Sequence, residues 1–164
     1  MSVARERAVV ALEPRQALDL WLDTARWPTF VAGFGAIEQL HERWPEPGAR
    51  AVWHSKPGGR GTVTEKVAEL EPPGRIVVEV LDDQLSGRQT ATFEPDEEGE
   101  GSRVLVELDY KLGEGGPLRA IANFIFIRRA LRDSIRRTLE RFAVEAAEET
   151  ALPDPSAPPA PPGS

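Results

Sequence analysis

Six short β-prone runs, separated at close intervals by turn residues, come before one long helical pattern in this chain. The runs cover about residues 36–44, 49–55, 61–70, 75–81, 87–94 and 103–111. Short spacings rich in Pro and Gly are typical of an antiparallel meander. After Pro117 neither Gly nor Pro interrupts the apolar period until about Glu149, which predicts one helix roughly 45 Å long. These two features together constrain the chain to an α+β fold.

The segment before the meander predicts one more strand and a broken pair of short helices. Residues 3–12 have the β-branched, alternating character of a strand, and Pro14 suits the first turn of a helix that should run to about Thr24. Pro28 disfavours helical angles at the residue before it, so a second short helix or turn is expected around residues 29–32. The sheet should therefore have seven strands.

The length of 164 residues and the apolar content of 40% suit one domain, which we place at residues 1–149. Residues 150–164 are rich in Pro, so we expect a disordered tail. No run of eighteen apolar residues and no leader pattern is visible, which predicts a cytoplasmic protein.

Composition also argues against several classes of function. The chain has no cysteine and only two histidines, His41 and His54, so we expect no metal site, and no cofactor motif is present. The net charge of −7 disfavours nucleic acid as a partner, because phosphate contacts need an extended basic surface.

Four motifs along the chain carry a resemblance to a known family. They are Asp23…Trp27-Pro28…Phe30, Pro72-Pro73-Gly74-Arg75-Ile76, Gly87…Thr92-Phe93-Glu94-Pro95, and Ser102-Arg103-Val104 leading to Leu108 and Tyr110. In this order, over about residues 3–149, the chain resembles the START-like (SRPBCC) superfamily of polyketide cyclases, dehydrases and lipid-transport proteins. The resemblance implies a helix-grip fold, in which a curved antiparallel sheet wraps the C-terminal helix around an apolar cavity. Val77-Val78 departs from the pattern, since relatives often place a tryptophan there.

Strand alternation selects the side chains that should face such a cavity. Trp53, Gln89, Phe93 and Tyr110 are predicted to point inward. Two interpretations stay open for each of them, because an inward aromatic side chain is either ordinary core or a ligand contact.

The long helix supplies a further set of candidates. Its predicted apolar stripe consists of Ile121, Phe124, Ile127, Leu131, Ile135, Leu139 and Phe142, and Arg128 projects into the same stripe. An inward guanidinium needs a partner, so Arg128 either pairs with an acid such as Glu65 or Glu79, extends to the edge, or binds a ligand oxygen. Ile121, Phe124, Arg128 and Leu131 join the strand residues as candidate ligand contacts.

The same helix is rich in arginine. Seven arginines against two acids between Arg119 and Arg141 give it a local charge of +5, and most of them project outward. They form either a solvated face or a contact surface for an anionic membrane or a protein partner. Phe126 also projects outward, and with Phe30 and Phe34 it is a candidate for the mouth of the cavity.

Three functions follow from these patterns. The first is a binding or carrier protein for a hydrophobic small molecule such as a lipid, a quinone or a polyketide-like chain. The second is a polyketide aromatase, cyclase or dehydratase that uses Arg128, Tyr110 and His54 as acids or hydrogen-bond donors. A third is a protein-interaction module that uses the arginine-rich helix.

Overall fold

Seven antiparallel strands form one curved sheet in the computed structural model, which describes residues 2–113 and 117–152 and, in the last helix, side chains from residue 125 onward. The strands are β1 (Ser2–Val10), β2 (Phe34–Leu40), β3 (Arg50–Ser55), β4 (Thr62–Glu71), β5 (Arg75–Leu81), β6 (Leu85–Pro95) and β7 (Ser102–Leu112). Their spatial order is β1-β7-β6-β5-β4-β3-β2, so the first and last strands are neighbours. The predicted meander is confirmed.

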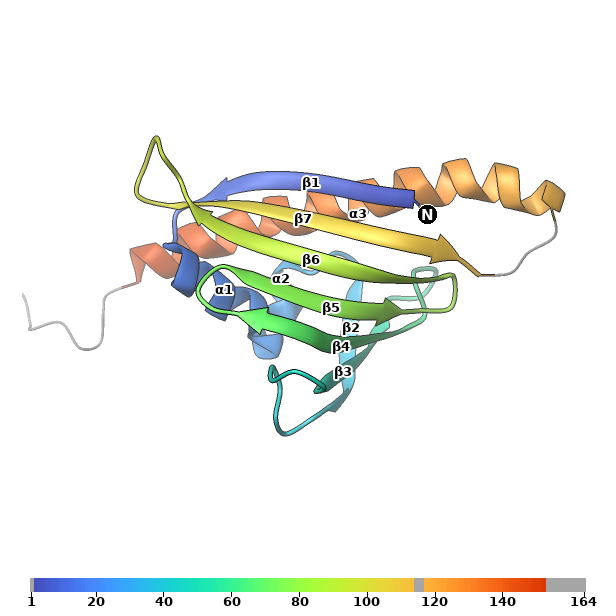
Figure 1. Ribbon diagram of the computed structural model, residues 1–164, viewed down its shortest axis with the longest axis horizontal. Coiled ribbons are helices and arrows are strands. Elements are labelled where there is room, and N and C mark those ends of the chain that lie inside the picture. Colours follow the sequence, from blue (N-terminus) through green and yellow to red (C-terminus); the bar gives the residue numbers. More distant parts are fainter. Residues whose placement is uncertain (1, 114–116, 153–164) are drawn as a thin grey trace, which may run out of the picture.

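Helices gather on one side of this sheet (Figure 1). Helix α1 (Pro14–Leu22), the 3-10 turn η1 (Thr24–Arg26) and helix α2 (Trp27–Phe30) follow β1, and the long helix α3 (Pro117–Ala151) runs beside β1. The curved sheet packs around α3, as the predicted helix-grip fold requires. Two irregularities in β2, after Phe34 and after Ile37, bend the free edge of the sheet, because each extra residue bends the strand that carries it.

The two short helices differ in their limits from the prediction. Helix α1 ends at Leu22, and α2 occupies Trp27–Phe30 instead of residues 29–32. The Asp23 carboxylate accepts the backbone N–H of Ala25 at 3.1 Å and so starts a new turn there. Pro28 then lies in the first turn of α2, where a missing N–H is tolerated.

Strand β2 is shorter than predicted, because the chain turns at residues 41–44 to bury part of Trp44. The Trp44 indole N–H donates to the carbonyl oxygen of Leu22 at 3.0 Å. Its ring meets that of Trp27 edge-on, with the centroids 5.7 Å apart. This contact fastens the start of the meander to the helical segment that precedes it.

The core lies between the sheet and the three helices. Strand side chains such as Trp53, Val63, Phe93 and Val106 pack there with Leu18 of α1, Phe30 of α2 and Phe142 of α3. The ring of Phe142 lies 5.1 Å from that of Phe30 and 5.2 Å from that of Trp21. Phe142 thus connects the long helix to both short helices.

Only part of the stripe predicted for α3 is core. Leu131, Ile135, Leu139 and Phe142 are buried. Arg128, by contrast, is exposed, so the prediction that it faces the sheet is wrong. It lines an outer groove together with Glu6 of β1.

Candidate functional site

A small hollow lies between α2, α3 and the inner face of the sheet. Its volume is about 60 Å³. Its aromatic walls are Trp21, Trp27, Phe30 and Trp53, its polar side is formed by Arg60, Glu65 and Gln89, and α3 contributes Ser134, Ile135 and Thr138. A second space of about 10 Å³ continues past Trp21 and Trp27 toward Trp44, and Glu65 and Gln89 line it as well. Glu65 and Gln89 are therefore common to the two spaces, whereas Arg60 lines the first of them.

Glu65 is the acid of this hollow. It lies on β4 between the buried Val63 and Val67, so alternation directs its side chain to the inner face of the sheet. The indole N–H of Trp53 donates to Oε2 of Glu65 at 2.8 Å. Burial raises the pKa of Glu65 above its ordinary value, although the Trp53 hydrogen bond and the charge of Arg60 both act to lower it. The carboxyl group thus has an increased tendency to hold its proton.

Arg60 is the cation of the hollow, and a buried acid holds it in place. Its Nε donates to Oδ2 of Asp82 at 2.7 Å, and the Asp82 side chain is only 1% exposed. Oδ1 of Asp82 accepts the backbone N–H groups of Gln84 at 2.8 Å and Leu85 at 2.9 Å, so the carboxylate is fixed as well.

The guanidinium of Arg60 also has a free donor. It lies over the ring of Trp53, 5.8 Å from the centroid, in a cation–π arrangement. Its Nη2 is buried and has no hydrogen-bond partner among the residues that the structure describes. A buried donor without an acceptor is costly, which makes this atom a ready partner for a ligand oxygen.

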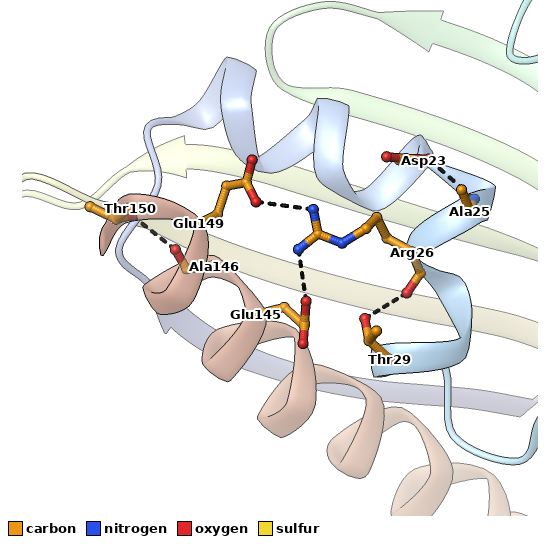
Figure 2. A network of polar contacts seen from close by, with 8 residues as sticks. All are labelled: Asp23, Ala25, Arg26, Thr29, Glu145, Ala146, Glu149 and Thr150. Carbon is orange, nitrogen blue, oxygen red and sulfur yellow. Dashed lines mark hydrogen bonds and ion pairs between the residues drawn. The ribbon is translucent and has the colours of Figure 1, made fainter. Parts of the chain in front are cut away.

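The helical segment that covers the hollow is fastened to α3 by Arg26 (Figure 2). Its Nη2 donates to Glu145 at 2.8 Å and its Nη1 to Glu149 at 3.0 Å. These hydrogen bonds raise the pKa of Arg26 above its usual value, and the one to Glu145 contributes most. The backbone N–H of Ala32 adds a hydrogen bond to Oγ1 of Thr138 at 3.0 Å. The cover of the hollow is therefore attached at both of its ends.

Three of the residues predicted from the sequence line the hollow: Trp53, Gln89 and Phe30. Phe30 was expected at a cavity mouth and instead forms part of the buried wall.

Phe93, Tyr110 and Leu131 are buried in the core, and neither space reaches them. The Tyr110 hydroxyl has no hydrogen-bond partner in the described part of the chain.

Other candidates lie apart from the hollow. His54 is exposed, and its Nε2 lies 3.1 Å from Oε2 of Glu38 on the neighbouring strand. Phe34 is buried behind Trp53, with ring centroids 5.3 Å apart, so it does not form a mouth. Phe126 is 76% exposed at the far end of α3 from Glu145. The side chains of Ile121 and Phe124 lie outside the described residues.

The catalytic set considered from the sequence does not converge. Arg128 and His54 are both exposed, on α3 and β3, while Tyr110 is buried in β7. Glu65 does not meet Arg128 as one interpretation required, and Glu79 is exposed. Sequence reasoning missed Arg60 altogether, because a Gly-rich turn has no period that could show where its side chain points.

A model of the family described as "Polyketide cyclase / dehydrase and lipid transport" matches residues 1–147 of the chain. The chain belongs to this family. No curated protein sequence matches it.

Solved structures share the fold of this member of the polyketide cyclase / dehydrase and lipid transport family. TTHA0849 from Thermus thermophilus is 17% identical, with a TM-score of 0.70 over 91% of this chain and 99% of that one. The di-domain ARO/CYC StfQ from the steffimycin biosynthetic pathway is also 17% identical, with a TM-score of 0.70 over 92% of this chain and 52% of that one. A norcoclaurine synthase point mutant from Thalictrum, in complex with a transition-state analogue, is 11% identical, with a TM-score of 0.67 over 91% and 96%. At these identities the likeness shows the fold alone.

Proposed function

We propose that the protein binds and carries a hydrophobic small molecule, such as a lipid, a quinone or a polyketide-like chain, in the hollow beneath α2. The observation that carries the proposal is an aromatic-walled space with Glu65 and Arg60 on its polar side, where the buried Nη2 of Arg60 has no partner among the described residues. Mostly apolar walls with a few convergent polar groups are what a ligand site needs. The family description, which includes lipid transport, supports the same role.

The arrangement of the walls suggests how the ligand lies. Its apolar body packs against Trp21, Trp27 and Phe30, and an oxygen atom accepts a hydrogen bond from Arg60. When Glu65 holds its proton, its hydroxyl can donate to the same oxygen.

The size of the space implies movement on binding. Pockets that enclose a drug-sized ligand measure about 300–1,000 Å³, and this hollow measures about 60 Å³. We therefore expect the ligand to displace α2 from the sheet, which the Arg26 contacts to α3 would resist.

A pair of probes tests the role of the oxygen atom. We expect 2-naphthol to quench the tryptophan fluorescence of the full-length protein with higher affinity than naphthalene. Arg60→Gln should weaken 2-naphthol binding by about tenfold or more, the scale of a hydrogen bond to a charged group, and leave naphthalene binding nearly unchanged. Arg43→Gln, an exposed arginine paired with Glu46, is the matched control. Equal affinities for both probes in wild type and in Arg60→Gln would contradict this site.

Native mass spectrometry of the gently purified protein is the direct test of cargo. A bound apolar molecule, reduced in occupancy in the Arg60→Gln variant, is the expected result. A preparation that is consistently free of ligand, together with no response to an apolar probe panel, would contradict a carrier role.

Glu65 favours a second candidate function, that of a cyclase or dehydratase. A carboxyl group whose pKa is raised by burial can act as a general acid, and Arg60 is placed to polarise a carbonyl group beside it. A carrier returns its ligand with unchanged mass, whereas a dehydratase, or a cyclase that completes an aldol condensation with dehydration, returns a product lighter by one water molecule. In that case Glu65→Gln should abolish the mass change and preserve binding.

A further inference from the structure

Near its start, α3 presents two large apolar side chains to solvent. Ile125 is 63% exposed and Phe126 is 76% exposed. Figure 1 shows that the start of α3 extends past the beginning of β1. Two large apolar side chains in sequence on a protruding helix are unusual on a surface that meets only water.

Arginines lie beside the first of these two side chains. Ile125 shares an outer groove of about 420 Å³ with Arg128, Arg129, Arg132 and Arg136, and the acids Glu6 and Asp133 line it as well. Between residues 125 and 141 the chain has six arginines and two acids, although its overall net charge is −7. Positive charge is therefore concentrated on this stretch of the helix, before the acidic residues near its end.

Internal ion pairs leave much of that charge available. Arg132 lies 3.6 Å from Glu6, and Arg136 lies 2.7 Å from Asp133. Arg128 and Arg129 are exposed and form no ion pair among the residues that the structure describes. Exposed pairs of this kind contribute little to stability, so stabilising the fold does not explain the cluster.

We infer that this surface, formed by Ile125, Phe126, Arg128, Arg129, Arg132 and Arg136 and called here the basic face of α3, docks on an anionic lipid bilayer. Basic side chains beside exposed apolar ones are the pattern of a helix that binds at a membrane interface. The arginines meet lipid phosphates, while Ile125 and Phe126 enter the boundary between headgroups and acyl chains. A protruding apolar end suits a bilayer better than an acidic protein, because a bilayer accepts it without a shaped pocket.

The contact is peripheral. No helix in the described part of the chain is long and apolar enough to cross a membrane. Ile135, which lines the hollow, lies nine residues after Phe126, or about 14 Å along the helix. Docking through the basic face would therefore hold the hollow close to the lipid surface. The docking itself does not depend on which ligand the hollow takes.

Co-sedimentation of the full-length protein with vesicles tests the proposal. We expect binding to vesicles of phosphatidylcholine that contain roughly one-third phosphatidylglycerol, and much weaker binding to phosphatidylcholine alone. The binding should decrease as sodium chloride rises from about 0.05 to 0.5 M, since salt screens the charges.

Two variants separate the charged and the apolar parts of the surface. Arg128→Gln with Arg129→Gln should lower the partition coefficient by about 25-fold, at about fivefold for each arginine. Ile125→Ser with Phe126→Ser should lower it by about tenfold or more. The matched controls on the same helix are Arg141→Gln and Val144→Ser, both at exposed positions, and we expect both to bind as wild type does. Unchanged thermal unfolding of each variant would show that the fold is intact.

Two results would overturn the proposal. One is wild-type binding that does not depend on anionic lipid. The other is binding to soluble polyglutamate that equals binding to vesicles and does not change in the Ile125→Ser, Phe126→Ser variant, which would assign the basic face to an acidic protein partner instead.

Discussion

Two stretches of α3, residues 125–130 and residues 131–146, carry the same apolar period but differ in burial. From Leu131 to Ala146 the residues at helical spacing are buried against the sheet and the short helices. From Ile125 to Ala130 nearly every side chain is exposed, and only Ile127 packs partly against the core. An apolar period thus predicts which residues share a face of a helix. Those residues become core only where another part of the protein packs against that face.

The largest expected effect comes from replacing one phenylalanine in each of these two stretches. Phe142→Ala should lower the free energy of unfolding by about 3–5 kcal/mol, because it leaves a cavity among Trp21, Phe30 and Phe93. Phe126→Ala should change it by less than about 0.5 kcal/mol. Urea unfolding of both variants measures the difference. Similar losses in the two would show that the start of α3 is packed after all.

Loss of the contacts between Arg26 and the C-terminal end of α3 should have a smaller effect on stability. Arg26→Ala removes both hydrogen bonds to α3 and leaves Glu145 half-buried without its partner, so we expect a loss of roughly 1–2 kcal/mol. It should also increase the quenching of tryptophan fluorescence by acrylamide, because the cover over the hollow is loosened. Arg43→Ala, which removes an exposed pair, should have almost no effect on either measurement.

The buried Glu65 of the hollow should make the free energy of unfolding depend on pH. Because burial raises the pKa of Glu65, the folded protein holds a proton that the unfolded chain releases, and stability falls as pH rises from the unfolded pKa to the folded one. Glu65→Gln should remove this decrease. We expect the variant to melt above wild type at about pH 8 and near it at about pH 4, where Glu65 is mostly protonated in both the folded and the unfolded protein. A variant less stable than wild type at pH 8 would contradict the assignment.

The smallest expected effect is at Arg128. Since its side chain is exposed, Arg128→Ala should change stability by less than about 0.5 kcal/mol and leave 2-naphthol binding unchanged. Arg60→Gln provides the contrast within the hollow. Loss of 2-naphthol binding in Arg128→Ala would show that Arg128 faces the hollow, as the helical period had predicted.

Strand alternation predicted part of the site from the sequence. Trp53 and Gln89 were predicted to point inward by alternation, and both line the hollow. The same alternation places Glu65 on the inner face with Val63 and Val67, although its contact with Trp53 depends on the pairing of β3 and β4. Arg60 had no such signal, because its position depends on Asp82 in a distant turn.

The sequence alone determined the order of the elements, the seven strands and the inward side of β3, β6 and β7, because turn residues and periodicity are local properties of the chain. Only the tertiary structure decided where the sheet ends beside α3, which polar groups share the hollow, and how small that hollow is. These depend on contacts between residues far apart in the chain, such as Arg26 with Glu145 and Arg60 with Asp82, and no local pattern records them.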